Sequence, residues 1–572
     1  MNRNTPMIFD DLPVVERPRS TFKMPQEIKL SGSVGSVIPF YNEKVLPGDT
    51  MRINTSMVLR MSTPIAPFMD NIVADIYYFF VPNRLVWSHW QNFMGESEAA
   101  WYDPGVEYTI PQIVADSTDG WAIGGIADYL GYPVGIPSFK ASALPFRAYA
   151  KICEDWFRSE ANSDPLFIPV GDSDQTGTND GDDYVDDVAN GGKCFKAGKL
   201  RDYFVSALPQ PQFGEPTSLS LTGDVPVFGN GKALGVSDGT KFAGVGTAGS
   251  DNSAIPFEGL IGKQIGTSVS GNLFNNNLGI GVLTKKQIEE SNAGLTKSDT
   301  GLVADLGNTP LITINELRMA FQVQKMQETL ARSGNRYIEI IKGLFGVTSP
   351  DARLQRSEYL GGSRVPVQVN QVLQTSQTAT TPQGTTAAYS LTADSHFDFE
   401  KSFTEHGYVM GMLVLRYKHT YQQGIDREFL RKTRNDFYNP IFANIGEQGI
   451  KNAEIYAQGP AAINAETGKA YDEEIFGYQE AWADYRYKQN RTAGYMRSQA
   501  TDSLDFWHLG DDYSELPHLS DEWIRESSDN VDRVLTVTES AAGFQFFADM
   551  YVENKATRVI PHYSIPGLMD HH

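Results

Sequence analysis

The sequence predicts a mainly β protein: a β-sandwich whose connecting loops have grown long. Residues 51–61 are apolar at nearly every odd position and mostly polar in between, as in a strand with one buried face. Residues 72–81 and 408–417 are denser apolar runs, which suit strands that are covered on both faces. Long stretches separate these segments, so the pattern does not fit a βαβ repeat and favours a sandwich with large insertions.

Further segments complete this expectation. Residues 531–537 and 544–552 are additional strand candidates because both are short apolar runs. Residues 142–160 predict a helix, with apolar side chains at helical spacing and with Glu154 and Arg158 placed as an i,i+4 ion pair.

Two more helices are expected in the second half of the chain. Residues 313–333 begin with a capping box, Thr313 and Glu316, and the helical pattern ends at the turn residues Ser333-Gly334-Asn335. A short third helix is expected at 426–434. None of these helices carries a catalytic motif.

Composition limits the classes of protein that remain. The chain has 572 residues, enough for several domains, and 41% apolar residues, enough for a large core. Its two cysteines, Cys153 and Cys194, form neither a disulfide framework nor a zinc site. The N-terminus lacks the apolar segment of a signal peptide, and the best apolar run, Val409–Leu415, is strand-sized, so we expect neither secretion by that route nor a transmembrane segment.

The net charge of −22 restricts how the chain could meet nucleic acid. Affinity for phosphate comes from Lys and Arg, which release counterions, so a protein of this charge does not coat DNA by bulk electrostatics. Any contact with DNA must be local, or a separate basic protein must neutralise the nucleic acid.

Glycine content divides the chain into three parts, 1–210, 211–310 and 311–572. The middle part holds 18 of the 52 glycines and contains Phe but no Tyr or Trp. One interpretation is a flexible linker. Interspersed apolar residues favour the other interpretation, a folded excursion from the main domain.

Searches for chemical motifs favour a protein that is not an enzyme. Gly244-x-Gly246-x-x-Gly249 matches a dinucleotide fingerprint by letters only, because no strand pattern precedes it and no helix pattern follows it. Asp172, Asp174 and Asp183 resemble an imperfect calcium loop. A solvated acidic loop explains these three residues more simply, so calcium is a secondary hypothesis and no other cofactor is expected.

Cations alternate with aromatic residues in 485–497, a pattern that can stack bases and neutralise phosphate. Residues 427–434 form a second basic cluster. The alternative is that these charges pair with acidic residues at subunit contacts. The candidate DNA-contact residues are Arg486, Lys488, Arg491, Arg497, Arg427 and Arg431.

Several motifs resemble those of one protein family, the major capsid proteins of the gokushoviruses (Microviridae). The segments Phe345-Gly346-Val347, Ser349–Arg356 and Glu358–Gly362 match its pattern almost residue for residue. Asp75–Trp87 and the closing segment Tyr563–His571 are also similar to that family. The poorest match lies between about 214 and 306.

This resemblance implies an eight-stranded antiparallel jelly roll with long loop insertions and a few helices. It implies a major capsid protein that self-assembles into a T=1 icosahedral shell around a circular single-stranded DNA genome. The virion would be that of a bacteriophage, assembled in the host bacterial cytoplasm. The implied partners are further copies of the chain, the DNA, a small basic DNA-binding viral protein and a host cell-surface receptor.

The resemblance also gives the insertion 211–310 a role, because gokushovirus capsid proteins carry a protrusion there at each threefold axis. Phe228, Phe242 and Phe257 are candidates for packing between copies or for facing the receptor. The alternative function is a β-sandwich protein that binds or modifies carbohydrate, since aromatic and acidic residues also suit sugars.

Overall fold

The structure is a computed structural model, and it separates the chain into two compact units, residues 1–214 with 327–572, and residues 215–326. It describes residues 18–96, 106–181, 183–215, 227–229, 234–237, 242–247, 280–283, 302–304, 314–334, 336–378 and 382–563. The predicted division at 210 and 310, and the surface role of the insertion, remain predictions.

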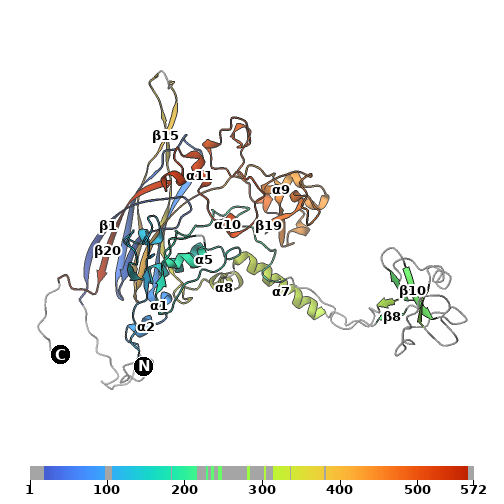
Figure 1. The fold of residues 1–572 in the computed structure, drawn as a ribbon, viewed down its shortest axis with the longest axis horizontal. Helices are drawn as coiled ribbons and strands as arrows, with labels where there is room; N and C mark the ends of the chain where they lie inside the picture. Colours follow the sequence, from blue (N-terminus) through green and yellow to red (C-terminus); the bar gives the residue numbers. More distant parts are fainter. Residues whose placement is uncertain are drawn as a thin grey trace. The chain divides into compact units, whose positions relative to one another are not determined.

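The larger unit is built on two four-stranded antiparallel sheets (Figure 1). The first sheet has the order β1 (Ser20–Gly32), β20 (Phe546–Arg558), β3 (Thr50–Met61), β16 (Thr392–Ser402). The second has the order β13 (Glu358–Pro366), β4 (Ile72–Pro82), β17 (Gly407–Tyr417), β2 (Ile38–Val45). The first four strands along the chain alternate between the two sheets, and the last strand lies between the first and third. This is the arrangement of a jelly roll, as expected.

The core lies between the inner faces of these sheets, where buried residues of both sheets form one cluster. In β3 every odd position is buried, as the alternation of residues 51–61 predicted. Met57 and Leu59 are 1% and 0% exposed. Burying side chains of this size stabilises a fold by roughly 1.5–3 kcal/mol each.

The second sheet is covered on both faces. Phe79 and Met412 point away from the sandwich core and join a second buried cluster with α4 (Leu144–Ile152). The dense apolar runs at 72–81 and 408–417 are therefore confirmed as doubly covered strands. After α4 the chain makes a π-helical turn, Cys153–Phe157, and the predicted Glu154–Arg158 pair closes at 2.8 Å.

Helices and short strands fill the long connections of the sandwich. The remaining α-helices are α1 (Asn83–Val86), α2 (Trp90–Phe93), α3 (Ile126–Tyr129), α5 (Tyr184–Asp187), α7 (Ile314–Ser333), α8 (Tyr337–Phe345), α9 (Asn452–Ile455), α10 (Asp521–Ile524), α11 (Asp529–Val534) and α12 (Glu539–Ala542). The short strands of the larger unit are β5 (Gln112–Val114), β6 (Lys140–Ser142), β7 (Gln175–Thr176), β14 (Val369–Leu373), β15 (Thr386–Ser390), β18 (Glu447–Lys451) and β19 (Ile475–Glu480).

In the unit 215–326 the described strands are β8 (Val227–Gly229), β9 (Leu234–Ser237), β10 (Phe242–Thr247), β11 (Ile280–Leu283) and β12 (Leu302–Ala304). Strand β10 pairs with β9 and β11, and β8 pairs with β12. Gly244 and Gly246 lie inside β10, whereas a dinucleotide fingerprint would lie between a strand and a helix.

Two secondary-structure predictions are wrong. The strand expected at 531–537 is the helix α11, because Val531 and Val534 are buried on one side of a helical turn, and a short apolar run fits either state. The helix expected at 426–434 is instead two 3₁₀ turns, Arg427–Leu430 and Arg434–Asp436. The Asp426 carboxylate caps the first turn by accepting from the Glu428 amide, but the backbone is extended at Arg431, so the helix does not continue. The helix expected at 313–333 is confirmed as α7, while its cap residue Thr313 lies outside the described residues.

Candidate functional site

Two of the four candidate cations in the predicted DNA-binding segment 485–497 pair with acidic side chains of the same chain. Arg486 forms an ion pair with Glu480, and Lys488 lies 3.4 Å from Asp426. The Arg497 guanidinium donates to a backbone carbonyl at 2.6 Å. Pairing of this kind is the alternative that the sequence left open, although here the partners belong to the same subunit.

The second basic cluster behaves in the same way. Arg427 lies 3.2 Å from Glu454, a carboxylate that is almost completely buried. Arg431 pairs with Asp484, and its guanidinium lies 4.4 Å from the centre of the Tyr485 ring. Through these ion pairs, the two arginines connect separate loops within residues 418–545.

Arg491 differs from the other five candidates. Its exposed side chain makes no hydrogen bond or ion pair with any residue that the structure describes. It lines a hollow of about 680 Å³ that also includes Lys418 and Arg364. The lining contains three cations and a single carboxylate, Asp70, so this hollow is a locally positive surface on an acidic protein.

A buried carboxylate fixes one wall of this hollow. Asp75, in β4, is 1% exposed and accepts from Arg364 at 2.5 Å and from Arg416 at 2.5 Å. Burial by itself raises the pKa of Asp75, but hydrogen bonds and charges from the two arginines outweigh it and hold the pKa below its usual range. The side chain of Arg364 is nevertheless 56% exposed and stays accessible from the hollow.

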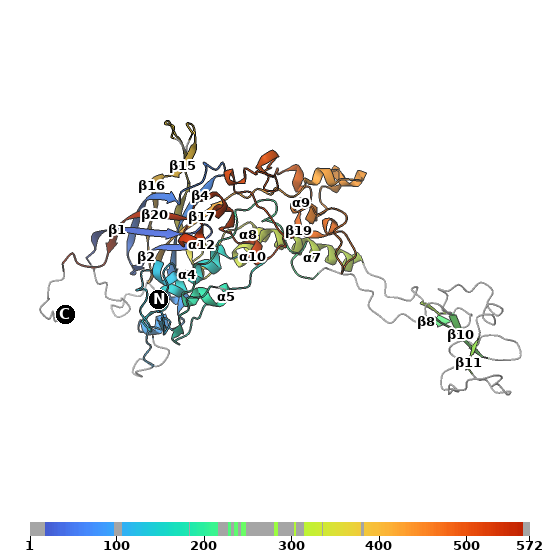
Figure 2. The ribbon, with the colours of Figure 1, turned by 45° about the horizontal axis from the view of Figure 1, so that its top comes forward.

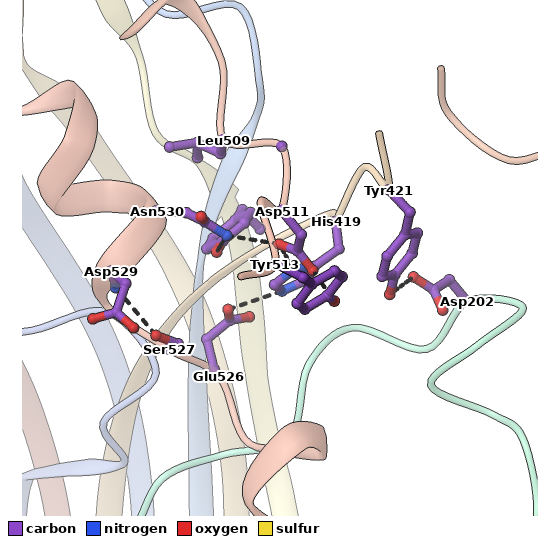
Figure 3. Close-up of polar contacts among 12 residues, drawn as sticks. Asp202, His419, Tyr421, Leu509, Asp511, Tyr513, Glu526, Ser527, Asp529 and Asn530 are labelled. Carbon is purple, nitrogen blue, oxygen red and sulfur yellow. Dashed lines mark hydrogen bonds and ion pairs between the residues drawn. The ribbon is translucent and has the colours of Figure 1, made fainter. Parts of the chain in front are cut away.

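A second polar site lies deeper in the same unit, around His419 (Figure 3). The imidazole Nδ1 donates to Asp511 at 2.8 Å, and Nε2 donates to Glu526 at 2.9 Å. Asp511 also accepts from Asn530 at 2.6 Å and from the Tyr513 hydroxyl at 2.8 Å. The network connects the segment after β17 to the loop that precedes β20.

The charge of this site follows from its geometry. Burial alone lowers the pKa of His419, but the attraction of Asp511 and Glu526 outweighs burial and raises that pKa to about 9. Burial likewise opposes ionisation of Asp511, yet the histidine and the hydrogen bonds lower its pKa to about 2. Both imidazole nitrogens are occupied by carboxylates, so this arrangement stabilises a buried cation and leaves neither nitrogen to activate a nucleophile.

The predicted calcium residues do not converge. Asp172 accepts from the Trp87 indole at 2.7 Å, Asp174 from the Gln112 amide at 3.0 Å, and Asp183 caps α5 through Val185. Within the described ranges no three acidic, histidine or cysteine side chains are grouped so that they could hold a metal ion. Each of the three carboxylates has a structural partner of its own, and calcium binding stays a secondary prediction.

The other predicted residues lie in the insertion. Phe228 is in β8 and Phe242 is in β10, while Phe257 lies outside the described residues. Their packing between copies or toward a receptor remains a prediction.

Sequence reasoning missed both the hollow and the His419 network. Lys418 and Arg364 are far from Arg491 in the chain, and His419, Asp511 and Glu526 are spread over more than a hundred residues. No spacing rule links such positions.

In the part of the chain that the structure describes, no helix is long and apolar enough to cross a membrane.

Comparison with known proteins agrees with this architecture. Residues 11–568 match the family described as "Capsid protein (F protein)". The chain is 40% identical to capsid protein VP1 of Spiroplasma virus 4, over 96% of this chain and 95% of that protein. It is 36% identical to the VP1 capsid proteins of Chlamydia phage 1 (98% of this chain, 97% of that protein) and Bdellovibrio phage phiMH2K (99% and 98%). The chain therefore belongs to the phage capsid F protein family and is a major capsid protein of the gokushovirus (Microviridae) type.

Proposed function

We propose that copies of this chain assemble into a T=1 icosahedral shell that encloses a circular single-stranded DNA genome. The match of nearly the whole chain to phage capsid proteins carries this proposal, and the jelly-roll sandwich supports it. Large apolar side chains remain exposed on the larger unit, including Ile441 at 85% and Phe345 at 75%. Such side chains suit contacts between subunits, which we expect to bury well over roughly 1,200 Å² in total.

Electron microscopy of particles purified from infected or expressing cells tests the assembly. The expected result is a closed shell with T=1 symmetry in which every subunit has the same environment. A soluble monomer, an open filament or a shell of higher triangulation number would contradict the proposal. Nuclease treatment tests the proposed genome. DNA inside the particle should resist nuclease, and DNA released from the particle should be digested by a single-strand-specific nuclease.

The DNA contact is proposed at the hollow lined by Arg491, Lys418 and Arg364. The acidic chain needs a local site, and Arg491 and Lys418 have no ion-pair partner among the described residues, so their charges are available to phosphate. Tyr495, which is 70% exposed and directly precedes Met496 of the lining, offers a ring on which a base can stack. A small basic viral protein would neutralise most of the remaining genome charge.

The double variant Arg491→Ala, Lys418→Ala tests this contact. It should lower the DNA content per particle while shells still form, because neither side chain supports the fold through a hydrogen bond. Lys432→Ala is the matched control, since its side chain is 78% exposed and lies outside the hollow. Equal DNA content in all three particles, or an outward-facing hollow in the shell, would refute the assignment.

The insertion 211–310 is proposed to carry the surface that faces the host receptor, at a threefold axis. Its glycine-rich, small polar composition suits an exposed excursion, and long insertions of this kind are usually functional. Exchanging residues 223–300 for the equivalent segment of a relative with another host tests this role. Particles that form with an unchanged attachment range would refute it, and failure to form particles would show that the segment is chiefly structural.

A further inference from the structure

The hairpin formed by β14 (Val369–Leu373) and β15 (Thr386–Ser390) extends away from the sandwich in both views (Figures 1 and 2). Its five residue pairs run from Val369 opposite Ser390 to Leu373 opposite Thr386. Among the described residues, these two strands form a sheet of their own. A two-stranded hairpin in water is at best marginally stable, so an extended one needs support from a surface that it contacts.

The hairpin carries no charge. From Val365 to Ala393, 29 consecutive residues include no Asp, Glu, Lys or Arg, although 21% of the whole chain is charged. At that average, about six charged residues would be expected in a segment of this length. Proteins usually protect exposed strand edges with charged side chains, and this hairpin has none.

Apolar side chains are exposed along the same hairpin. Val372, Leu373 and Tyr389 are 44%, 55% and 49% exposed, and Leu391 just beyond β15 is 40% exposed. Val367, just before β14, is buried in the sandwich core, whereas in β15 the side chains alternate and Ala388 is 6% exposed. Exposure therefore increases along β14 away from the sandwich core, while β15 and the residue after it leave Tyr389 and Leu391 exposed.

We propose that this hairpin is an assembly contact that packs against a second copy of the chain. Interface cores are depleted of charge and enriched in aromatic and apolar side chains, as this segment is. Copies that each carry −22 repel one another, so an uncharged contact is favoured for self-association. DNA would require cations and a basic viral protein would require acids, and the hairpin offers neither.

Replacing one apolar hairpin residue by a charged one tests the contact. The proposal of this contact rests on the shell proposed above. Leu373→Asp should reduce the yield of closed particles at least about tenfold, since a desolvated unpaired carboxylate costs more than 1.4 kcal/mol at each contact. The matched control is Gln91→Asp, which adds the same charge at an exposed polar side chain outside the hairpin. Circular dichroism and the melting temperature of the unassembled variant should match the wild type.

Hydrogen exchange on the wild-type chain gives a second measurement that needs no variant. Backbone amides of β14 and β15 should exchange at least about tenfold more slowly in assembled particles than in dissociated subunits. Unchanged exchange together with normal assembly of Leu373→Asp would overturn the hairpin contact while leaving the shell intact. Failure of the wild-type chain to form particles would instead refute the shell itself, so the two failures are distinguishable.

Discussion

The buried histidine network gives a prediction whose magnitude follows from the structure. Replacing His419 by Gln removes a buried cation and leaves Asp511 and Glu526, 3% and 2% exposed, without it. The pKa of His419 is about 9 in the folded chain, against an ordinary value of 6.5. This difference corresponds to about 3 kcal/mol of stabilisation from the protonated form.

The sign of the pH dependence follows from the direction of the shift. Because the folded pKa is raised, the stabilisation is complete below about pH 6.5 and is lost as pH rises through about 9. At pH 6 the variant should therefore unfold with a free energy lower by about 3 kcal/mol or more. Above pH 9 the difference should shrink to what remains from altered packing and hydrogen bonding.

Guanidinium unfolding followed by tryptophan fluorescence measures this difference, at a single protein concentration because assembly shifts the midpoint. Tyr417→Phe is the matched control, since it removes the hydroxyl that accepts from Asn530 and burial keeps its pKa well above this range. Its cost should be about 1 kcal/mol at every pH. An equal difference between wild type and His419→Gln at pH 6 and above pH 9 would refute the buried imidazolium.

Three further outcomes follow from the packing of the larger unit. Leu59→Ala, on the inner face of β3, should lower the free energy of unfolding by about 2–5 kcal/mol, whereas Arg60→Ala on its outer face should change it by no more than about 0.5 kcal/mol; equal effects would contradict the sandwich. Asp75→Ala should lower it by about 3–5 kcal/mol, because the two arginines that contact this carboxylate lose their partner; a change below 1 kcal/mol in chemical denaturation would contradict the network. Burial raises the pKa of Cys194 to about 12 and that of Cys153 well above its ordinary value, so a thiol reagent should label both only after unfolding, and rapid labelling of the native chain would contradict their burial.

Local periodicity predicted the conformation correctly where residues that are close in the sequence determine it. Alternation at 51–61 predicted which face of β3 is buried, and the dense run at 408–417 predicted a strand covered on both faces. It failed at 531–537, since a short apolar run does not distinguish a buried strand from one turn of helix. It failed at 426–434 because the turn that Asp426 caps ends at Arg431, where the backbone becomes extended.

The charged residues show a second limit of the sequence. The alternation of cations and aromatics at 485–497 indicated a surface for nucleic acid, yet Arg486 and Lys488 are paired with carboxylates of the same chain. Among these cations Arg491 alone has neither a hydrogen bond nor an ion pair with the described residues, and its cationic neighbours in the hollow come from β13 and from the segment after β17. A sequence shows which residues are charged, but the partner of each charge depends on how the chain folds.

By itself, the sequence determined the β class, four of the eight sandwich strands (β3, β4, β17 and β20), the helical segments at 142–160 and 313–333, and the capsid family, because periodicity and motifs are properties of neighbouring residues. Only the tertiary structure decided the order of strands in the two sheets, the buried His419 network, the basic hollow and the exposure of the uncharged hairpin. Each of these depends on which distant segments come together or are left uncovered. That outcome is set by burying one common core and is not encoded in any single local pattern.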